Sequence, residues 1–305
     1  MCLCASLLAG CPERGSGGVA NPGHPTDRGA SLQSTPLGSP PVLVSAGDIA
    51  DCSSAGDEAT ANLLDSLRGT IAVLGDNAYP NGTDANYAAC YEPTWGRHKA
   101  RTRPTPGNHE YRTAGAGGYF RYFGSTAGDP DKGYYSYDLG DWHIVVLNSN
   151  SNCADVRCGT GSLQLRWLRD DLAAHPAKCT LAYWHHPRFN SGAHHGNNIN
   201  VAGFWRALYD SGADVVLNGH EHLYERFAPQ TPDAVPDPHR GIRQFTVGTG
   251  GRREYGFGRI QPNSEVRQRG TDGVLKLELE DDGYRWEFIP AHGGTFKDSG
   301  SGQCH

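Results

Sequence analysis

The chain has 305 residues, with 33 acidic and 27 basic side chains and a formal net charge of −6. Nucleic-acid-binding domains usually carry a basic excess, so this balance argues against nucleic acid as a partner. Hydrophobic residues make up 37% of the chain, which is enough for a packed core. No apolar run approaches the ~20 residues of a membrane span. The 41 Gly and 19 Pro residues favour a loop-rich α/β or β protein over a helical bundle.

The first eleven residues are small and apolar, and they end in the string Leu8-Ala9-Gly10-Cys11. This string resembles the processing box of bacterial lipoproteins, so residues 1–11 are interpreted as an export signal with Cys11 as the lipidated, membrane-attached residue. A plain cleaved export signal is the alternative, and a cytosolic N-terminus is the least favoured. Residues 12–40 are rich in Gly, Pro, Ser and Thr, which predicts a flexible tether. We therefore expect an exported protein, either in the periplasm or cell envelope or secreted, with its folded domain at 41–305.

Three of the nine Cys residues lie in the first eleven positions. The others are Cys52, Cys90, Cys153, Cys158, Cys179 and Cys304. An even number of Cys in an exported chain favours disulfides, although six Cys allow 15 pairings. Cys153 and Cys158 are close together in a polar loop and form the favoured single pair. A zinc site built from these Cys is less favoured.

Short continuous apolar runs predict strands that are buried on both faces. These runs are at 42–44, 71–74, 180–184 and 214–217. Helical spacing of Leu and aromatic residues predicts helices between them, at 58–67, 162–175 and 204–209. Gly-containing turns predict two hairpins, which pair 134–139 with 142–147 and 273–280 with 283–289. We find no internal repeat, and the pattern predicts one α/β domain with parallel and antiparallel strands.

Residue types that bind metals follow directly after the predicted strands and, at Gly107, after an extended segment that contains Pro. The motifs, in chain order, are Gly47-Asp48, Gly75-Asp76-Asn77-Ala78-Tyr79, Gly107-Asn108-His109-Glu110, His185-His186 and Gly219-His220-Glu221-His222. Ligands of open α/β sheets collect at the carboxyl ends of strands, so these motifs can converge on one place. Carboxylate, amide oxygen and imidazole ligands suit Fe, Mn and Zn. An Asp shared by two ions would give a two-metal site with the ions about 3.5–4 Å apart.

These motifs, in this order, resemble those of the calcineurin-like metallophosphoesterases. Members of the broader family often have His two residues after the first Asp, where this chain has Ala50. Tyr79 and the pair His194-His195 instead resemble the purple acid phosphatases, as does the segment 134–138. The resemblance covers most of residues 41–292. It implies an α/β sandwich of two mixed β-sheets flanked by helices, with a binuclear metal site at the strand ends.

The resemblance also implies a role for each site residue. One metal would be held by Asp48, Asp76, Tyr79 and His222. The second metal would be held by Asp76, Asn108, His185 and His220. The residues facing the substrate would be His109, His195 and His194. A phenolate ligand points to Fe(III) as the first ion, with a divalent Fe, Zn or Mn ion as its partner.

The expected function is the hydrolysis of small phosphate monoesters by a metal-bound hydroxide. A phosphodiesterase acting on cyclic nucleotides or glycerophosphodiesters is an alternative that would use the same ligands. A catalytically silent module that binds metal or phosphate is the non-enzymatic alternative. A group of Arg residues between 240 and 259 could steer an anionic substrate, although such clusters are more often solvated loops.

Overall fold

The computed structural model describes residues 38–150, 159, 161–291 and 293–305. Within this part, Ser39–His305 forms one compact unit. None of the described helices is both long enough and apolar enough to cross a membrane. The predicted export signal, most of the predicted tether and the predicted pair of Cys153 and Cys158 lie outside the described residues.

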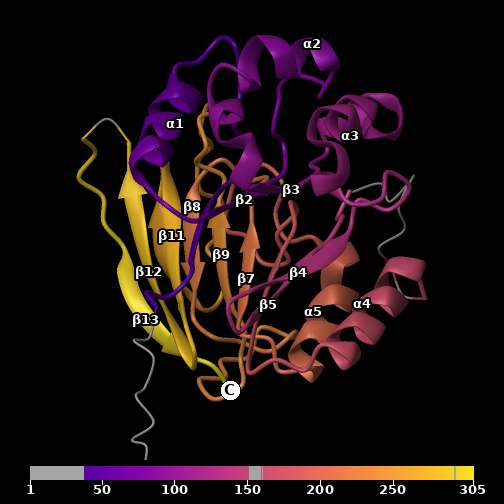
Figure 1. Cartoon of the computed structure of the whole chain (residues 1–305). Coiled ribbons are helices and arrows are strands. Elements are labelled where there is room, and N and C mark those ends of the chain that lie inside the picture. The colour runs from indigo at the N-terminus through magenta and orange to yellow at the C-terminus, as the bar shows by residue number, and fades with distance from the viewer. Residues whose placement is uncertain (1–37, 151–158, 160, 292) are drawn as a thin grey trace, which may run out of the picture. The chain divides into compact units, whose positions relative to one another are not determined.

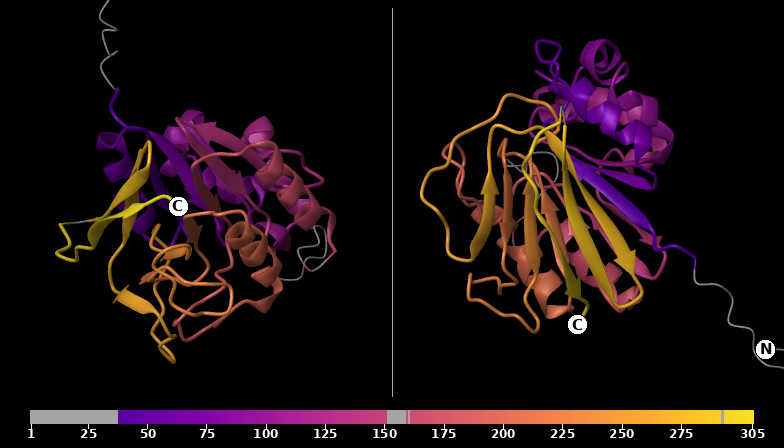
Figure 2. Two further views of the ribbon diagram at one scale, coloured as in Figure 1. Left: turned by 90° about the horizontal axis from the view of Figure 1, so that it is seen from below. Right: turned by 90° about the vertical axis from the view of Figure 1, so that its left-hand side faces the viewer.

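Two mixed β-sheets form the centre of this unit (Figure 1). The first sheet has the strand order β13-β12-β11-β1-β2-β3. Its strands are β1 (Val42–Ala46), β2 (Thr70–Leu74), β3 (Thr102–Thr105), β11 (Gly273–Glu280), β12 (Gly283–Pro290) and β13 (Ser299–Gln303). β1 pairs in parallel with β2 and antiparallel with β11. The first strand of the domain is therefore central, and in Figure 2 the indigo β1 lies beside the yellow C-terminal strands.

The second sheet has the strand order β10-β8-β9-β7-β6-β5-β4. Its strands are β4 (Tyr135–Leu139), β5 (Trp142–Val146), β6 (Cys179–Tyr183), β7 (Val215–Asn218), β8 (Tyr224–Phe227), β9 (Arg243–Val247) and β10 (Ser264–Gln268). Strands β5, β6, β7 and β9 run parallel to one another. Their carboxyl ends therefore meet at one edge of the sheet, as those of β1, β2 and β3 do in the first sheet.

The main helices are α1 (Gly56–Ser66), α2 (Asp84–Asn86), α3 (Gly117–Phe123), α4 (Leu163–Ala174) and α5 (Ala202–Asp210). Short 3-10 and π turns connect them and are η1 (Tyr87–Tyr91), η2 (Trp95–Arg101), η3 (Glu110–Arg112), η4 (Ala114–Ala116), η5 (Gly124–Ala127) and η6 (Ile199–Val201). In Figure 1, α4 and α5 lie together beside the second sheet, and α1 lies near β11. Helices therefore flank both sheets, as the sequence predicts.

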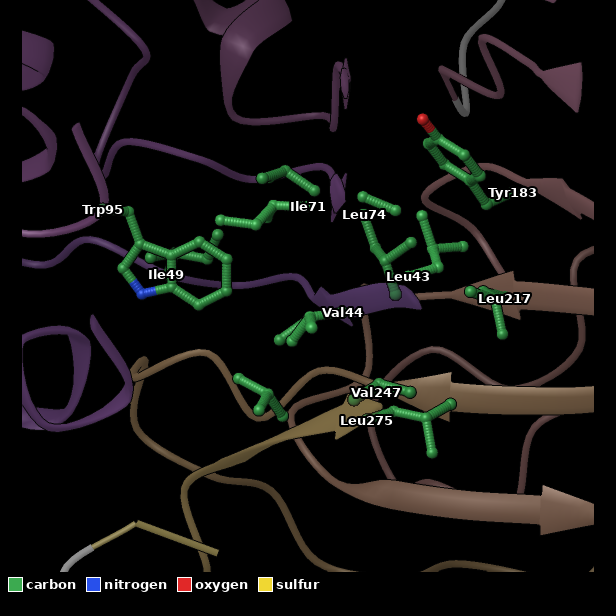
Figure 3. Close-up of a cluster of buried hydrophobic side chains, with 14 of the residues drawn as sticks. Leu43, Val44, Ile49, Ile71, Leu74, Trp95, Tyr183, Leu217, Val247 and Leu275 are labelled. Atoms are coloured by element: carbon green, nitrogen blue, oxygen red, sulfur yellow. The ribbon is translucent and has the colours of Figure 1, made fainter. Parts of the chain in front are cut away.

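Successive side chains of a strand point to opposite faces of the sheet, so each strand contributes to two layers of core. In β6, Leu181 and Tyr183 belong to the large cluster that contains side chains of both sheets. Ala182 points the other way, into a second cluster with Leu168 of α4 and Phe204 of α5. Figure 3 shows part of the large cluster, where side chains from β1, β2, β6, β7, β9 and β11 meet. This packing places the carboxyl ends of strands from both sheets at a common edge.

The predicted buried strands, helices and hairpins are confirmed within a few residues. Ser162 caps α4 by accepting a hydrogen bond from the Leu165 backbone N–H, as its position before the helix predicts. Strands β8, β9, β10 and β13 are not among the elements predicted from the sequence. Strand β8 is only four residues long and contains Glu225 and Arg226, while β13 is a Ser- and Gly-rich edge strand. Neither carries the apolar pattern on which the predictions depend.

Disulfides are present between Cys52 and Cys90 and between Cys179 and Cys304. The second bridge spans 125 positions of sequence and ties the start of β6 to the C-terminal segment after β13. A cross-link over a loop of this length strongly restricts the unfolded chain. Sequence alone could not select these two pairs from the 15 possible pairings.

His143 links the β4–β5 hairpin to α4. Its Nδ1 lies 2.9 Å from Asp138 Oδ1, and its Nε2 lies 2.9 Å from Asp171 Oδ2. Its ring also stacks on that of His175. Burial lowers the pKa of His143, but the hydrogen bonds and charges of Asp171 and Asp138 outweigh burial and raise the pKa above its ordinary value of 6.5. The charged imidazole is therefore the form that the fold stabilises.

We expect His143→Gln to destabilise the protein more at pH 5.5 than at pH 8.5. A pKa raised by folding gives stability that is fully present below the unfolded pKa of about 6.5 and is lost as the pH rises through the folded pKa. Removing one partner of a buried ion pair costs about 3–5 kcal/mol when the pair is charged. Urea unfolding of both proteins at the two pH values measures this difference. An equal loss at both pH values would contradict the charged state of His143.

Candidate active site

The predicted ligands lie on loops that leave the carboxyl ends of five strands. Asp48, Asp76 and Asn108 follow β1, β2 and β3 of the first sheet. His185 and His220 follow β6 and β7 of the second sheet. The edge where the two sheets meet therefore collects carboxylate, amide and imidazole groups from distant parts of the chain.

Several of these residues have a strained backbone. Asp48, Asp76 and His220 have φ values of 60°, 49° and 74°, and among the described residues only six non-glycine residues have positive φ. Left-handed conformations of such residues cost free energy, and they concentrate at functional sites. The neighbouring Gly107 has no room for a side chain, because a Cβ there would lie 2.2 Å from Asp76 Oδ1. The loops are thus folded tightly against the candidate ligands.

A first group of donor atoms surrounds the hydroxyl of Tyr79. This oxygen lies 3.0 Å from Asp48 Oδ1, 3.1 Å from Asp76 Oδ2 and 3.2 Å from His222 Nε2. Ligands at 2.0–2.2 Å from one ion are separated from each other by about 3.0–3.6 Å. His222 Nδ1 lies 2.6 Å from the Arg253 carbonyl oxygen, which leaves Nε2 free to face the group. The spacing fits a single metal ion.

A second group surrounds His185 Nε2. This nitrogen lies 3.1 Å from Asn108 Oδ1, 3.1 Å from His220 Nδ1 and 3.4 Å from Asp76 Oδ2. His185 Nδ1 lies 2.8 Å from the Leu74 carbonyl oxygen, so it carries the proton and Nε2 faces the group. Asp76 Oδ2 belongs to both groups. Two ions could therefore share one carboxylate oxygen.

The charges in this site are almost completely buried. Asp48 and Asp76 are 0% and 2% exposed. Burial raises the pKa of Tyr79 well above its ordinary value of 10, and the charges of Asp48 and Asp76 raise it further. Burial lowers the pKa of His185, but the charge and hydrogen bond of Asp76, together with the charge of Asp48 and the contact with the Leu74 carbonyl, outweigh burial and raise the pKa to about 9. Without a metal ion, a proton on His185 therefore balances part of the negative charge, and a bound cation would displace it.

Glu110 organises the loop that carries Asp76. Its carboxylate is fully buried and accepts hydrogen bonds from the backbone N–H groups of Gly107, Asp76 and Asn77 at 2.7, 3.0 and 2.9 Å. A buried carboxylate needs such partners. The sequence places Glu110 in a candidate motif but does not indicate this role, because the bonds depend on how two separate loops meet.

The three residues predicted to face the substrate occupy different positions. His109 lies beside Tyr79, with 4.4 Å between ring centres, and its Nδ1 lies 2.6 Å from the Pro80 carbonyl oxygen. The ring of His195 lies 3.9 Å from that of His220 and its side chain is 37% exposed. His194 packs instead on Tyr255. His109 and His195 thus lie next to the donor groups, and His194 lies farther out.

Sequence reasoning missed the role of two further residues beside the donor groups. Tyr255 stacks on His222 with ring centres 4.0 Å apart. Glu221 accepts a hydrogen bond from His195. A charged residue between two candidate ligands was the only signal for Glu221, and an isolated Tyr in a Gly-rich loop gave none for Tyr255.

Two of the arginines considered for substrate steering, Arg252 and Arg243, lie in different surroundings. Arg252 lies over the Tyr79 ring at 4.8 Å and forms an ion pair with Asp51. Arg243 pairs with Glu265 and packs over Trp286. Only the first of these two arginines contacts a residue of the donor groups.

A sequence profile described as Calcineurin-like phosphoesterase matches residues 33–224. Purple acid phosphatase 22 of Arabidopsis thaliana is 35% identical over 126 residues, which are 40% of this chain and 27% of that protein. Probable purple acid phosphatase 20 of the same plant is 30% identical over 173 residues, which are 53% of this chain and 39% of that protein. The match thus spans well under half the length of these relatives.

Two solved structures share the fold. The purple acid phosphatase PPD1 from yellow lupin (Lupinus luteus) seeds has a TM-score of 0.65 at 18% identity, covering 86% of this chain and 53% of that chain. GAP50, described as the anchor in the inner membrane complex of Plasmodium, has a TM-score of 0.68 at 14% identity, covering 88% of this chain and 90% of that chain. The second likeness extends over nearly the whole of both chains.

We expect Glu110→Gln to lower the free energy of unfolding by about 1–3 kcal/mol, because an amide group would face backbone N–H donors and leave one unpaired. Glu58→Gln is the matched control, since Glu58 is 48% exposed and forms a surface ion pair with Arg97. Its removal should cost less than about 1 kcal/mol. Equal losses for the two variants, measured by urea unfolding, would show that Glu110 does not hold the loop.

Proposed function

This chain belongs to the calcineurin-like phosphoesterase family, in its purple acid phosphatase-like branch, and we propose that it hydrolyses phosphate monoesters with two metal ions. The observation that carries the proposal is the position of Asp76 Oδ2. It lies 3.1 Å from Tyr79 Oη in one donor group and 3.4 Å from His185 Nε2 in the other. A shared carboxylate oxygen between two sets of ligands is the arrangement that a two-metal site requires.

The donor atoms fit two ions of the kind that accept both oxygen and nitrogen ligands. Asp48, Asp76, Tyr79 and His222 would hold the first ion. Asp76, Asn108, His185 and His220 would hold the second ion. When bound, two such ions supply Lewis acidity, which neutralises charge on the phosphoryl oxygens and lowers the pKa of water.

The chain's own residues provide the remaining chemistry. His109 is held through Nδ1 by Pro80, and its Nε2 lies 3.8 Å from Asp76 Oδ2, so it faces the donor groups. His195 is the more exposed imidazole at the same site. These two side chains can donate hydrogen bonds to the phosphoryl oxygens, and His195 can protonate the departing alkoxide. Water attacks phosphorus from the side opposite the leaving group.

The identity of the first ion follows from Tyr79. Burial and two neighbouring carboxylates hold the pKa of this phenol well above 10, so a strong Lewis acid is needed to ionise it. Fe(III) meets this requirement, and the group of Asn108, His185 and His220 suits a divalent ion. We therefore propose an Fe(III) ion at Tyr79 with divalent Fe, Zn or Mn as its partner.

We expect the purified metal-loaded protein to hydrolyse p-nitrophenyl phosphate, and EDTA to abolish this activity. His185→Ala should lower kcat/KM at least ~100-fold, because loss of a ligand removes several kcal/mol of charge stabilisation. His239→Ala, at an exposed loop position between β8 and β9, is the matched control and should change little. Faster hydrolysis of bis(p-nitrophenyl) phosphate than of the monoester would make the protein a phosphodiesterase. No hydrolysis of either ester would contradict the proposed function.

We expect Tyr79→Phe to remove the visible absorption of the iron-loaded protein, because phenolate-to-iron charge transfer needs the Tyr79 oxygen. Tyr255→Phe is the matched control, since the Tyr255 ring stacks on His222 but its hydroxyl is in neither donor group. This variant should keep the band. If wild type and Tyr79→Phe have the same spectrum when loaded with iron, Tyr79 does not bind the metal.

A further inference from the structure

Glu221 is a fully buried carboxylate between two candidate ligands. Its neighbours His220 and His222 point into different donor groups. The Glu221 side chain is 0% exposed and contacts the 190–196 loop. A buried charge is costly unless it is hydrogen-bonded, so its partners show what it holds in place.

Three N–H groups of this loop converge on the two oxygens of Glu221. Oε2 lies 3.0 Å from Asn190 Nδ2 and 2.9 Å from His195 Nδ1. Oε1 accepts a hydrogen bond from the His194 backbone N–H at 3.2 Å. The loop also approaches closely at Gly192, where a Cβ would lie 2.1 Å from Glu221 Cδ. The loop is therefore folded around this one carboxylate.

The contact with Glu221 fixes the orientation of His195. Because the carboxylate accepts a hydrogen bond at Nδ1, that nitrogen carries the proton and Nε2 is left for other partners. The ring lies against His220, with 3.9 Å between centres and a tilt of 34°. The imidazole is thus held at Nδ1 by Glu221, while the His195 side chain remains 37% exposed.

We propose that Glu221 is a positioning residue, which orients His195 so that its Nε2 can deliver a proton to the leaving group. This inference rests on the phosphoesterase function proposed above. In the step, the bond between phosphorus and the ester oxygen breaks and its electron pair goes to that oxygen. The oxygen takes the proton from Nε2, and the imidazole is left neutral with its Nδ1–H on Glu221. The oxygen of water forms the new bond to phosphorus and loses its proton to solvent.

A carboxylate that only stabilised the loop would not change the relative rates for esters with good and poor leaving groups. Glu225 provides a matched control of this kind. Glu225 is also fully buried and accepts a hydrogen bond from the Ser191 backbone N–H at 2.9 Å, so it holds the same loop. Its other oxygen accepts a hydrogen bond from the Ser264 hydroxyl. Among the described residues, Ser191 and Ser264 are its hydrogen-bond partners and His195 is not. Loss of either carboxylate disturbs the loop, but only Glu221 contacts the imidazole.

The test compares esters with good and poor leaving groups. In Glu221→Gln, an amide NH₂ group replaces one carboxylate oxygen and faces the N–H donors of Asn190, His194 and His195. One hydrogen-bond acceptor of these donors is lost. We expect kcat for glycerol phosphate to fall about 10–100-fold more than kcat for p-nitrophenyl phosphate, because only the alkoxide needs a proton from His195. KM should change less than kcat. Glu225→Gln should leave the ratio of the two rates as in wild type.

A double mutant shows whether Glu221 acts through His195. If it does, Glu221→Gln should add almost nothing to the defect of His195→Ala. Additive losses, or an unchanged ratio of the two rates in Glu221→Gln, would overturn the inference. Glu221→Met has similar length without an amide donor, and it replaces Glu221→Gln if that variant does not fold.

A measurement without activity separates this inference from the proposed function. In metal-free protein with ¹⁵N-labelled His, the His195 nitrogens can be assigned by comparison with His195→Ala. We expect a protonated Nδ1 in wild type and a different nitrogen pattern in the folded Glu221 variant. An unchanged pattern overturns the inference even if the protein is an active phosphoesterase. If wild type hydrolyses no ester, the proposed function fails and the proton-delivery role fails with it, whatever the nitrogen pattern.

Discussion

The burial of two carboxylates side by side is the constraint on which this site depends. Asp48 and Asp76 each have an oxygen within 3.1 Å of the same phenol oxygen, although both are almost completely buried. Charges in this environment must be paired or bind a metal ion. The backbone supplies part of the compensation, because His220 N–H donates to Asp48 Oδ2 at 2.7 Å and His109 N–H donates to Asp76 Oδ1 at 2.8 Å. A cation is the natural complement for the rest.

The same constraint explains the form of the surrounding loops. Each carboxylate accepts a hydrogen bond from the backbone of another loop, so the loops must approach more closely than ordinary side chains permit. Gly219 lies against Asp48, where a Cβ would be 2.8 Å from Oδ2. Asp48, Asp76 and His220 adopt positive φ values where the loops approach each other in this way. Their cost is tolerated because the two sheets beneath share one large core.

The sequence predicted the buried strands and the convergence of the ligands because four of the five ligand motifs follow a continuous apolar run, and sheet geometry then places the ends of such runs together. It could not predict the carboxylates that support them. Glu110 and Glu221 have partners 3 to 34 and 26 to 31 positions away, which depend on how loops pack. The disulfide partners and β13 lacked any local signal. The export signal and the lipid at Cys11 stay predictions.

The most direct test of the account is anomalous diffraction from crystals of the metal-loaded protein. The account predicts two peaks about 3.5–4 Å apart, both within bonding distance of Asp76. One peak should lie beside Asp48, Tyr79 and His222, and the other beside Asn108, His185 and His220. A single peak, or two peaks that do not share Asp76, would contradict the two-metal site.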